Sequence, residues 1–141
     1  LYSKYKLECE KILAEYHDDS FRTVSVRSAT VFGHSPRMRF DTVLNMFCLY
    51  AHNSHITVNG GLQVRPLIHI KDIAQFYVHL LYAPLDGGAY NYGLTNISLI
   101  DLAVKIKDDF LIRSESADNR SYRIDSMKAK QAFGISRPSA R

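Results

Sequence analysis

The stretch ITVNGGLQVRPLIHIKDIAQFYVHLL, residues 56–81, decides the fold class of this chain. Its first apolar run, 56–58, stops at Asn59-Gly60-Gly61, which is a strong turn signal. A second apolar run, 67–70, follows, and apolar residues then recur with a period of about 3.6. The stretch therefore predicts two strands followed by a helix, with Asp72 as the residue that caps the helix.

The segments on either side of this stretch continue the alternation of strands and helices. Residues 21–32 predict a mostly buried strand, because they alternate and then run apolar. We expect Ser98 to cap the fourth helix and Gly134 to terminate the last one. The other predicted helices lie at about residues 5–16, 38–50, 99–110 and 125–133, and the other predicted strands at 89–92 and 121–124. Such alternation indicates an α/β layer fold with a parallel sheet.

The composition is that of one ordinary domain. The chain has 141 residues, of which 46% are hydrophobic, and this is enough for a packed core. Its apolar runs are too short to span a bilayer, and no secretion signal stands at its start. Cys9 and Cys48 each lie on an apolar helical face, where we expect buried thiols. These features predict a cytoplasmic protein with no membrane partner.

The positive charge of the chain favours a small anionic ligand. The net charge of +4 comes from 18 Lys and Arg against 14 Asp and Glu. The arginines are scattered, and no run of five like charges occurs. We therefore expect no nucleic acid partner. A nucleic-acid module remains an alternative that rests on the net charge alone, and steeply salt-dependent binding would be its mark.

Tyr2 and Lys6 lie four residues apart, which places both side chains on one face of a helix. A phenol normally loses its proton only near pH ~10, and an ammonium group close by favours the phenolate. The pair is therefore a candidate acid/base device. The same spacing is common on solvated helices, so the pair alone leaves both interpretations open.

Four stretches, in order, carry a resemblance to a known family. They are Tyr2 to Lys11, with its Tyr-x-x-x-Lys; Arg27 to Gly33, which reads RSATVFG; Asn59 to Ala74, which reads NGGLQVRPLIHIKDIA; and Asn91-Tyr92-Gly93 with the later words RSYRID (120–125) and Phe133-Gly134. Together they span nearly the whole chain. The chain resembles the extended short-chain dehydrogenase/reductase family, in its branch of NAD-dependent nucleotide-sugar epimerases and dehydratases.

The resemblance implies an α/β fold, the C-terminal part of a Rossmann-type parallel sheet with an interleaved small α/β substrate-binding domain. Residues 1–33 would supply the catalytic helix and the following strand of the dinucleotide-binding domain. Residues 34–141 would be mainly substrate-binding domain, with about 67–93 returning to the dinucleotide-binding domain. No Gly-x-Gly-x-x-Gly follows a strand. We therefore expect the N-terminal dinucleotide-binding half and a catalytic Ser or Thr upstream of residue 1, and an inactive fragment without them.

The same resemblance assigns roles to five residues. Tyr2 would be the catalytic acid/base, while Tyr2 and Lys6 would contact NAD or NADP, Lys6 holding the ribose. Arg65 and Arg120 would bind the diphosphate of a nucleotide-diphosphate sugar, since a guanidinium grips two phosphate oxygens in a fixed fork. Thr30 stands where the family usually has a substrate-binding Asn, so a hydroxyl would replace an amide.

Other expectations concern assembly, metals and alternative functions. Family members often dimerise through the catalytic helix, so a homodimer through residues 1–16 is possible. His69 and Asp72 do not make a metal-ligand set, and we expect His69 to tie its strand to a neighbour. The alternatives for the whole protein are a nucleotide-sugar 4-reductase, or a non-catalytic nucleotide-binding or regulatory protein of the same fold.

Overall fold

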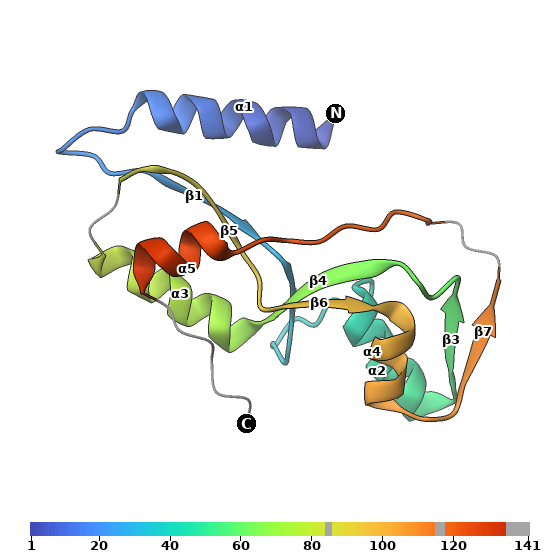
Figure 1. Cartoon of the computed structure of the whole chain (residues 1–141). Helices are drawn as coiled ribbons and strands as arrows, with labels where there is room; N and C mark the ends of the chain where they lie inside the picture. The colour runs from blue at the N-terminus through green and yellow to red at the C-terminus, as the bar shows by residue number, and fades with distance from the viewer. Residues whose placement is uncertain (84–85, 115–117, 135–141) are drawn as a thin grey trace.

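The computed structural model describes residues 1–83, 86–114 and 118–134 (Figure 1). The helices are α1 (Tyr2–Glu15), α2 (Val43–Asn53), α3 (Ile70–Tyr82), α4 (Leu99–Ile106) and α5 (Met127–Phe133). The strands are β1 (Val24–Ser28), β2 (Thr30–Phe32), β3 (Ile56–Asn59), β4 (Val64–His69), β5 (Gly88–Tyr92), β6 (Thr95–Ser98) and β7 (Phe110–Arg113). The alternation expected from the sequence is present.

The strands form three small sheets, and most of their pairs are parallel. β1 pairs with β5, β2 with β4, and β3 with β7, all in parallel. β4 also pairs with β6, antiparallel. Each parallel pair joins segments far apart in the sequence, because parallel strands need a crossover connection. The predicted α/β class with parallel pairing is confirmed.

Two hydrophobic cores hold these elements together. The first joins β1 and β5 to α3 and α5, and in it Phe76 stacks on Tyr92 with the ring centroids 3.8 Å apart. The second joins α2 and α4 to β3, β4 and β6, around the buried Phe47 and Ile56. Figure 1 shows α1 on the opposite side of β1 and β5 from α3 and α5. The β1–β5 pair is thus a middle layer between helices.

Neither a membrane span nor a metal cluster is found in the described part of the chain. No helix there combines the length and the apolar character needed to cross a membrane. No group of three or more His, Cys, Asp or Glu side chains there has the arrangement of a metal site.

The single strand predicted at residues 21–32 is wrong, because the chain changes sheets at Ala29. The Ala29 N–H donates to the Tyr92 carbonyl oxygen at 2.9 Å, and the chain then pairs with β4 as β2. Gly93 permits this close approach, since a Cβ at that position would lie 2.8 Å from the Ala29 Cβ. The two strands are half-buried rather than mostly buried.

The predicted start of α2 at Met38 is also wrong. A turn occupies residues 39–42 instead, with the Arg39 carbonyl oxygen accepting hydrogen bonds from Thr42 Oγ1 at 3.4 Å and from Asn45 Nδ2 at 2.9 Å. The Arg39 carbonyl oxygen is thus bonded by side chains and not by the backbone N–H of a helical turn, and α2 begins only at Val43.

The predicted helix at 99–110 ends four residues early, and the sequence analysis missed both β6 and β7. The backbone becomes extended at Lys107, whose ammonium group donates to the Ser54 carbonyl oxygen at 2.8 Å, just beyond the end of α2. Phe110 then opens β7, which pairs with β3. A tertiary contact of Lys107 therefore accompanies the end of a helix that local periodicity would have continued.

The helix caps agree with the prediction at two of three places. Ser98 accepts a hydrogen bond from the Asp101 N–H at 3.1 Å, and Gly134 ends α5 in the left-handed conformation, as expected. His69, and not Asp72, caps α3, because its Nδ1 accepts from the Lys71 N–H at 3.2 Å. Asp72 lies in the first turn, where a negative charge is favourable.

His69 also ties its strand to a neighbour, as expected, since its ring contacts Phe32 of β2 edge-on at 5.2 Å between centroids.

The expectation of buried thiols is wrong. Cys9 and Cys48 are both exposed, because α1 buries none of its residues and α2 buries the Asn45 and Phe47 side of its surface.

Candidate functional site

A cavity of about 860 Å³ lies where the two cores meet. Its walls come from the start of α1, the junction of β1 and β2, the turn before α2, the β3–β4 turn and the segment that leads to α5. Tyr2, Thr30 and Arg65 line this cavity, whereas Lys6 and Arg120 do not. The fold therefore brings three of the five predicted site residues to one cavity.

Tyr2 and Lys6 share one face of α1, as their spacing predicted. The Lys6 Nζ lies 5.6 Å from the centroid of the Tyr2 ring, which is the range of a cation–π contact. Tyr2 is 75% exposed, so a ligand can reach its hydroxyl. The two side chains thus present a phenol and an ammonium group on an open surface.

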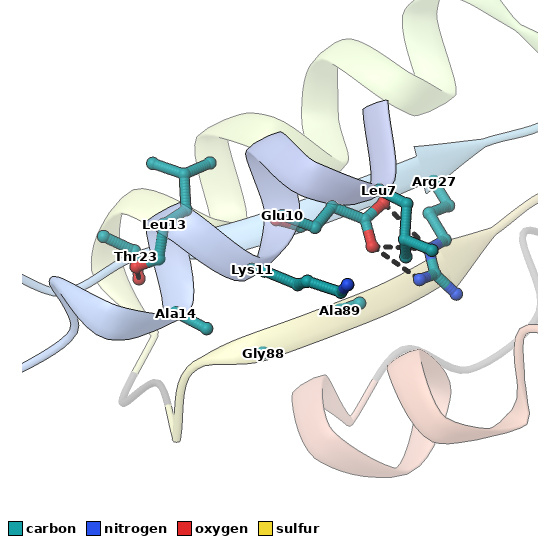
Figure 2. A pocket seen from close by; sticks show the side chains of 10 residues that line it. Leu7, Glu10, Lys11, Leu13, Ala14, Thr23, Arg27, Gly88 and Ala89 are labelled. Carbon is teal, nitrogen blue, oxygen red and sulfur yellow. Dashed lines mark hydrogen bonds and ion pairs between the residues drawn. The ribbon is translucent and has the colours of Figure 1, made fainter. Parts of the chain in front are cut away.

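Two polar contacts attach helix α1 to β1 and to the residue ahead of it. Arg27 of β1 makes a forked bond to Glu10, with Nε 2.9 Å from Oε1 and Nη2 bonded to Oε2 (Figure 2). Farther along the helix, the Thr23 hydroxyl donates to the Leu13 carbonyl oxygen at 2.8 Å. A second cavity, of about 260 Å³, separates α1 from β1 and β5. Figure 2 shows Leu7, Leu13 and Thr23 around it.

The Arg27 hydrogen bond lowers the pKa of Glu10, against the opposite effect of partial burial. The pair is therefore ionised at neutral pH. Glu10 lies eight residues after Tyr2 and four after Lys6, so all three side chains fall on one broad side of the helix. The Glu10–Arg27 bond thus turns the side that carries Tyr2 and Lys6 toward β1.

Arg65, at the start of β4, is fixed from several directions. Its side chain is only 12% exposed, and its Nη2 lies 3.2 Å from Asp118 Oδ2. Its Nη1 donates to the Val64 carbonyl oxygen at 3.1 Å and also to the Arg120 carbonyl oxygen. The Tyr122 ring lies against the guanidinium, 5.3 Å from Cζ to the centroid. The guanidinium therefore has one well-defined orientation at the cavity wall.

Asp118 joins Arg65 to Arg120, and sequence reasoning missed it. The Arg120 side chain forks onto this carboxylate, with Nε 2.7 Å from Oδ1 and Nη2 2.8 Å from Oδ2. The hydrogen bonds from Arg120, and the charge of Arg65, hold the pKa of Asp118 well below its usual range. The available signal was the Asp-x-Arg spacing, since Asp often bonds the backbone two residues on, as it does here at 3.1 Å.

The segment 118–126 carries Asp118, Arg120 and Tyr122 across the molecule, and its predicted strand at 121–124 is wrong. The backbone is extended, but side chains replace most of a strand ladder. The Val64 N–H donates to Ser121 Oγ at 3.0 Å, and the Asn96 amide exchanges two bonds, of 2.9 and 3.0 Å, with the backbone of Ile124. These bonds fix the segment beside β4.

Two more side chains complete this attachment. The Ser126 hydroxyl accepts from the Gly93 N–H and donates to the Gly93 carbonyl oxygen, both at 2.8 Å. Asp125 Oδ1 accepts from the Met127 N–H at 2.8 Å. The start of α5 is therefore anchored to the end of β5.

Gln63 is a buried residue that the sequence analysis also missed. Its Oε1 accepts from the Gly61 N–H at 2.6 Å, and its Nε2 donates to the carbonyl oxygens of Asn59 at 3.0 Å and Asp118 at 3.2 Å. Gly61 is required here, because its φ is 106° and a Cβ would lie 2.5 Å from Ile100. Gln63 thus connects the β3–β4 turn to the 118–126 segment, directly beside Arg65.

Thr30 and Arg39 add polar groups to the same wall. Thr30 opens β2 in register with Leu67, so its backbone belongs to the sheet while the residue lines the cavity. Arg39, in the turn before α2, pairs with Asp41 at the cavity rim, with Nε 3.0 Å from Oδ1. The cavity therefore has guanidinium groups on two of its sides.

Comparisons with known proteins agree with this picture. The sequence profile of the NAD dependent epimerase/dehydratase family matches residues 1–93. Among solved structures, UDP-N-acetylglucosamine 4-epimerase from Bacillus cereus has a TM-score of 0.77 at 23% identity, over 96% of this chain and 49% of that one. The UDP-N-acetylglucosamine 4-epimerase from Methanobrevibacter ruminantium M1, solved with UDP-N-acetylmuramic acid, has a TM-score of 0.79 at 21% identity, over 97% and 48%.

A dehydratase is similar to the same degree. The dTDP-glucose 4,6-dehydratase from Bacillus anthracis str. Ames, solved with NAD, has a TM-score of 0.77 at 20% identity, over 99% of this chain and 47% of that one. The chain spans about half the length of these structures, and at such identities the likeness shows a shared fold. The family match shows more than a shared fold, because it covers most of the chain. The matched residues include Tyr2, Lys6, Thr30 and Arg65. The chain therefore belongs to the NAD-dependent epimerase/dehydratase family, within the extended short-chain dehydrogenases/reductases.

Proposed function

We propose that this chain supplies the catalytic helix and the sugar-nucleotide site of an epimerase or dehydratase that acts on a nucleotide-diphosphate sugar. The observation that carries the proposal is the shared cavity: Tyr2, Thr30 and Arg65 come from three separate parts of the chain and line one space. A phenol at one wall and a fixed guanidinium at another suit a ligand that has a reactive sugar and a diphosphate.

In this proposal Tyr2 exchanges a proton with a hydroxyl group of the sugar. Lys6 lies beside Tyr2 on the same helix face, and its ammonium group holds the ribose of NAD or NADP. The residues present fit one side of such a cofactor, because the two donors lie together on an exposed face of α1. When bound, a nicotinamide cofactor supplies reversible hydride transfer.

Arg65 and Arg120 take the diphosphate in this proposal. Arg65 is the fixed member, with its orientation set by Tyr122 and by two carbonyl oxygens. Arg120 is the more exposed member, with a side chain that is 81% exposed. Thr30 lies at the same wall and offers its hydroxyl to the sugar or to the diphosphate.

The proposal also assigns the chain its place in a larger protein. Residues 1–33 and about 67–93 belong to the dinucleotide-binding domain, and the remainder belongs mainly to the substrate-binding domain. The Gly-rich phosphate loop and a third catalytic residue come from a preceding half, without which this chain alone is inactive. A homodimer through α1 is part of the proposal, and it is supported by the exposed Leu1, Tyr5 and Ile12.

The test is a turnover assay on the protein extended upstream to include that half. The protein is mixed with NAD or NADP and with a panel of UDP-, GDP-, CDP- and dTDP-sugars, and the products are separated by chromatography. We expect an epimerised or dehydrated sugar nucleotide from at least one mixture. A reduced sugar would favour the 4-reductase. Binding without turnover in every mixture, by folded protein, would favour the non-catalytic alternative and remove the enzyme proposal.

A further inference from the structure

The Asp118 carboxylate occupies the position that an anionic ligand would take between the two arginines of the proposed site. Its carboxylate accepts three hydrogen bonds from Arg120, two from the guanidinium and one from the backbone N–H, and a fourth bond from Arg65. A forked guanidinium recognises a carboxylate and a phosphate through the same geometry. The two arginines assigned to the diphosphate are therefore already engaged by a group from their own chain.

A diphosphate and the Asp118 carboxylate cannot both hold these arginines at full strength. Arg65 Nη1 is committed to two carbonyl oxygens, so a forked ligand would use the edge formed by Nε and Nη2, and it would have to share Nη2 with Asp118. A diphosphate beside an ionised Asp118 would also place like charges in contact, which is unfavourable. Binding is then an exchange of one anion for another.

The exposure of the Asp118 side chain leaves room for such an exchange. The Asp118 side chain is 44% exposed and can rotate toward solvent, while its carbonyl oxygen stays bonded to Gln63 Nε2. Arg65 keeps its contacts with Tyr122 and the carbonyl oxygens after Asp118 leaves. Arg120, whose side-chain hydrogen bonds among the described residues go to Asp118, can then turn toward a ligand.

We propose that Asp118 is an internal competitor for the diphosphate site: its carboxylate joins Arg65 and Arg120 until a diphosphate displaces it, so Asp118 sets the affinity of the site. This inference rests on the proposed function for the identity of the ligand. The opposite role is a permanent organiser, in which Asp118 must stay in place for the arginines to bind anything. The two roles predict opposite effects when the negative charge of Asp118 is removed.

The experiment is calorimetric titration of the 141-residue chain with inorganic pyrophosphate and with UDP, at neutral pH and low ionic strength. Four proteins are compared: the unchanged chain, Asp118→Asn, Arg65→Ala, and Asp109→Asn as a control. Asp109 is an exposed aspartate that does not line the cavity, so its variant has the same change in charge away from the site. Circular dichroism checks that each protein is folded.

We expect Asp118→Asn to bind pyrophosphate about tenfold more tightly, the usual size of one coupled interaction. Asp109→Asn should match the unchanged chain, and Arg65→Ala should lose binding. Equal or weaker binding by Asp118→Asn, with Arg65→Ala still defective, would overturn the competitor role and leave the proposed site intact. Absence of binding in all four proteins would remove the proposed site, and the competitor role with it.

A second measurement needs no substitution and so does not depend on the folding of a variant. The carboxyl ¹³C resonance of Asp118 is followed against pH, with and without saturating pyrophosphate. Its pKa is low because of its arginine partners, so displacement should raise that pKa toward the ordinary range for Asp. A pKa that stays equally low with pyrophosphate bound would show that the carboxylate keeps its arginines, and would overturn the inference.

Discussion

The two ends of the candidate site are held in opposite ways. Helix α1, which carries Tyr2 and Lys6, buries none of its residues and stands off the sheet over a cavity of about 260 Å³. Arg65 is 12% exposed and is surrounded by Gln63, Tyr122 and the 118–126 segment, each bonded to its neighbours. The Arg65 end is therefore organised by several contacts within this chain, whereas the Tyr2 end depends on a few polar contacts.

Because of this difference, a substitution at Arg65 and a displacement of α1 should have different consequences. A rigid guanidinium selects a ligand through geometry, and replacing it removes defined bonds. A helix held by an ion pair and one hydroxyl can shift as a body, and a small shift of a catalytic group has a large effect on rate. Substitutions at the two ends should therefore separate binding from turnover.

The largest expected effect is that of Tyr2→Phe in the extended protein. The change removes one hydroxyl and little volume, and loss of a general acid/base group should lower kcat by roughly 10²–10⁴-fold. The dissociation constant for the nucleotide sugar, from calorimetry, should change little, because the arginines proposed to hold the diphosphate lie at the other end. Tyr5→Phe on the same helix is the matched control, since Tyr5 does not line the cavity. Parallel losses of kcat and of affinity from Tyr2→Phe would mean that the two ends are not separate.

The next effect is that of Arg65→Ala on binding. A hydrogen bond to a charged group contributes about 1.5–3 kcal/mol, so affinity for the nucleotide sugar should fall roughly 10–100-fold. Binding of NAD or NADP, measured separately by fluorescence, should be unchanged. Arg113→Ala is the control, because that arginine ends β7 outside the cavity. Equal losses for sugar nucleotide and cofactor would contradict the diphosphate role.

A smaller effect should follow from Glu10→Gln, which weakens the attachment of α1 to β1. The pair is partly exposed, with Arg27 49% and Glu10 22% accessible, so we expect a loss of unfolding free energy of at most about 1 kcal/mol. Amide hydrogen exchange should accelerate in α1 but not in residues 118–126. Glu8→Gln is the control, since Glu8 pairs with Lys11 inside the helix and does not reach β1.

A charge reversal checks that the effect comes from the pair. Exchanging the two partners, as Glu10→Arg with Arg27→Glu, should restore part of the protection of α1 that either single change removes. If both single variants exchange like the unchanged chain, then α1 is held by contacts other than this ion pair.

The sequence predicted the features whose signals are local. The Tyr2–Lys6 spacing, the turn after Asn59, the Ser98 cap and the Gly134 stop are all decided within a few residues, and each is present. It missed Asp118 and Gln63 as site residues, because their decisive partners lie 53 and 55 residues away along the chain. Such pairs emerge only when the β3–β4 turn and the 118–126 segment meet.

The wrong predictions have the same origin. The strand expected at 121–124 has suitable residues, but side chains replace most of its ladder. The Val64 N–H of β4 bonds the Ser121 hydroxyl, and the backbone of Ile124 bonds the Asn96 amide, while the Tyr122 N–H bonds the Val64 carbonyl oxygen. The helix expected to reach Phe110 has suitable periodicity, but Lys107 caps the carbonyl end of α2 and Phe110 joins a sheet. Tertiary contacts overrode local preference at both places.

The smallest expected effect is a difference in acid sensitivity between the two ends. Glu10 and Asp118 both have lowered pKa values, Glu10 chiefly through the hydrogen bond from Arg27 and Asp118 chiefly through that from Arg120. Because each pKa is lower in the folded than in the unfolded state, each contribution to stability is present above the unfolded pKa and is lost as pH falls through the folded one. Asp118 starts from the lower ordinary pKa, 3.8 against 4.5 for Glu10, and that pKa is lowered far enough for the Asp118 bridge to persist at a more acidic pH. Acidification should therefore release α1 before it releases the 118–126 segment, at a cost of about 0.5 kcal/mol for the Glu10 pair.

Two measurements check this order. Carboxyl ¹³C titrations follow Glu10 and Asp118 directly. The free energy of unfolding of Glu10→Gln is compared with that of the unchanged chain at neutral pH and below the Glu10 pKa. The stability gap between the two proteins should close in acid, and an Asp118 that titrates above Glu10 would reverse the contrast between the ends.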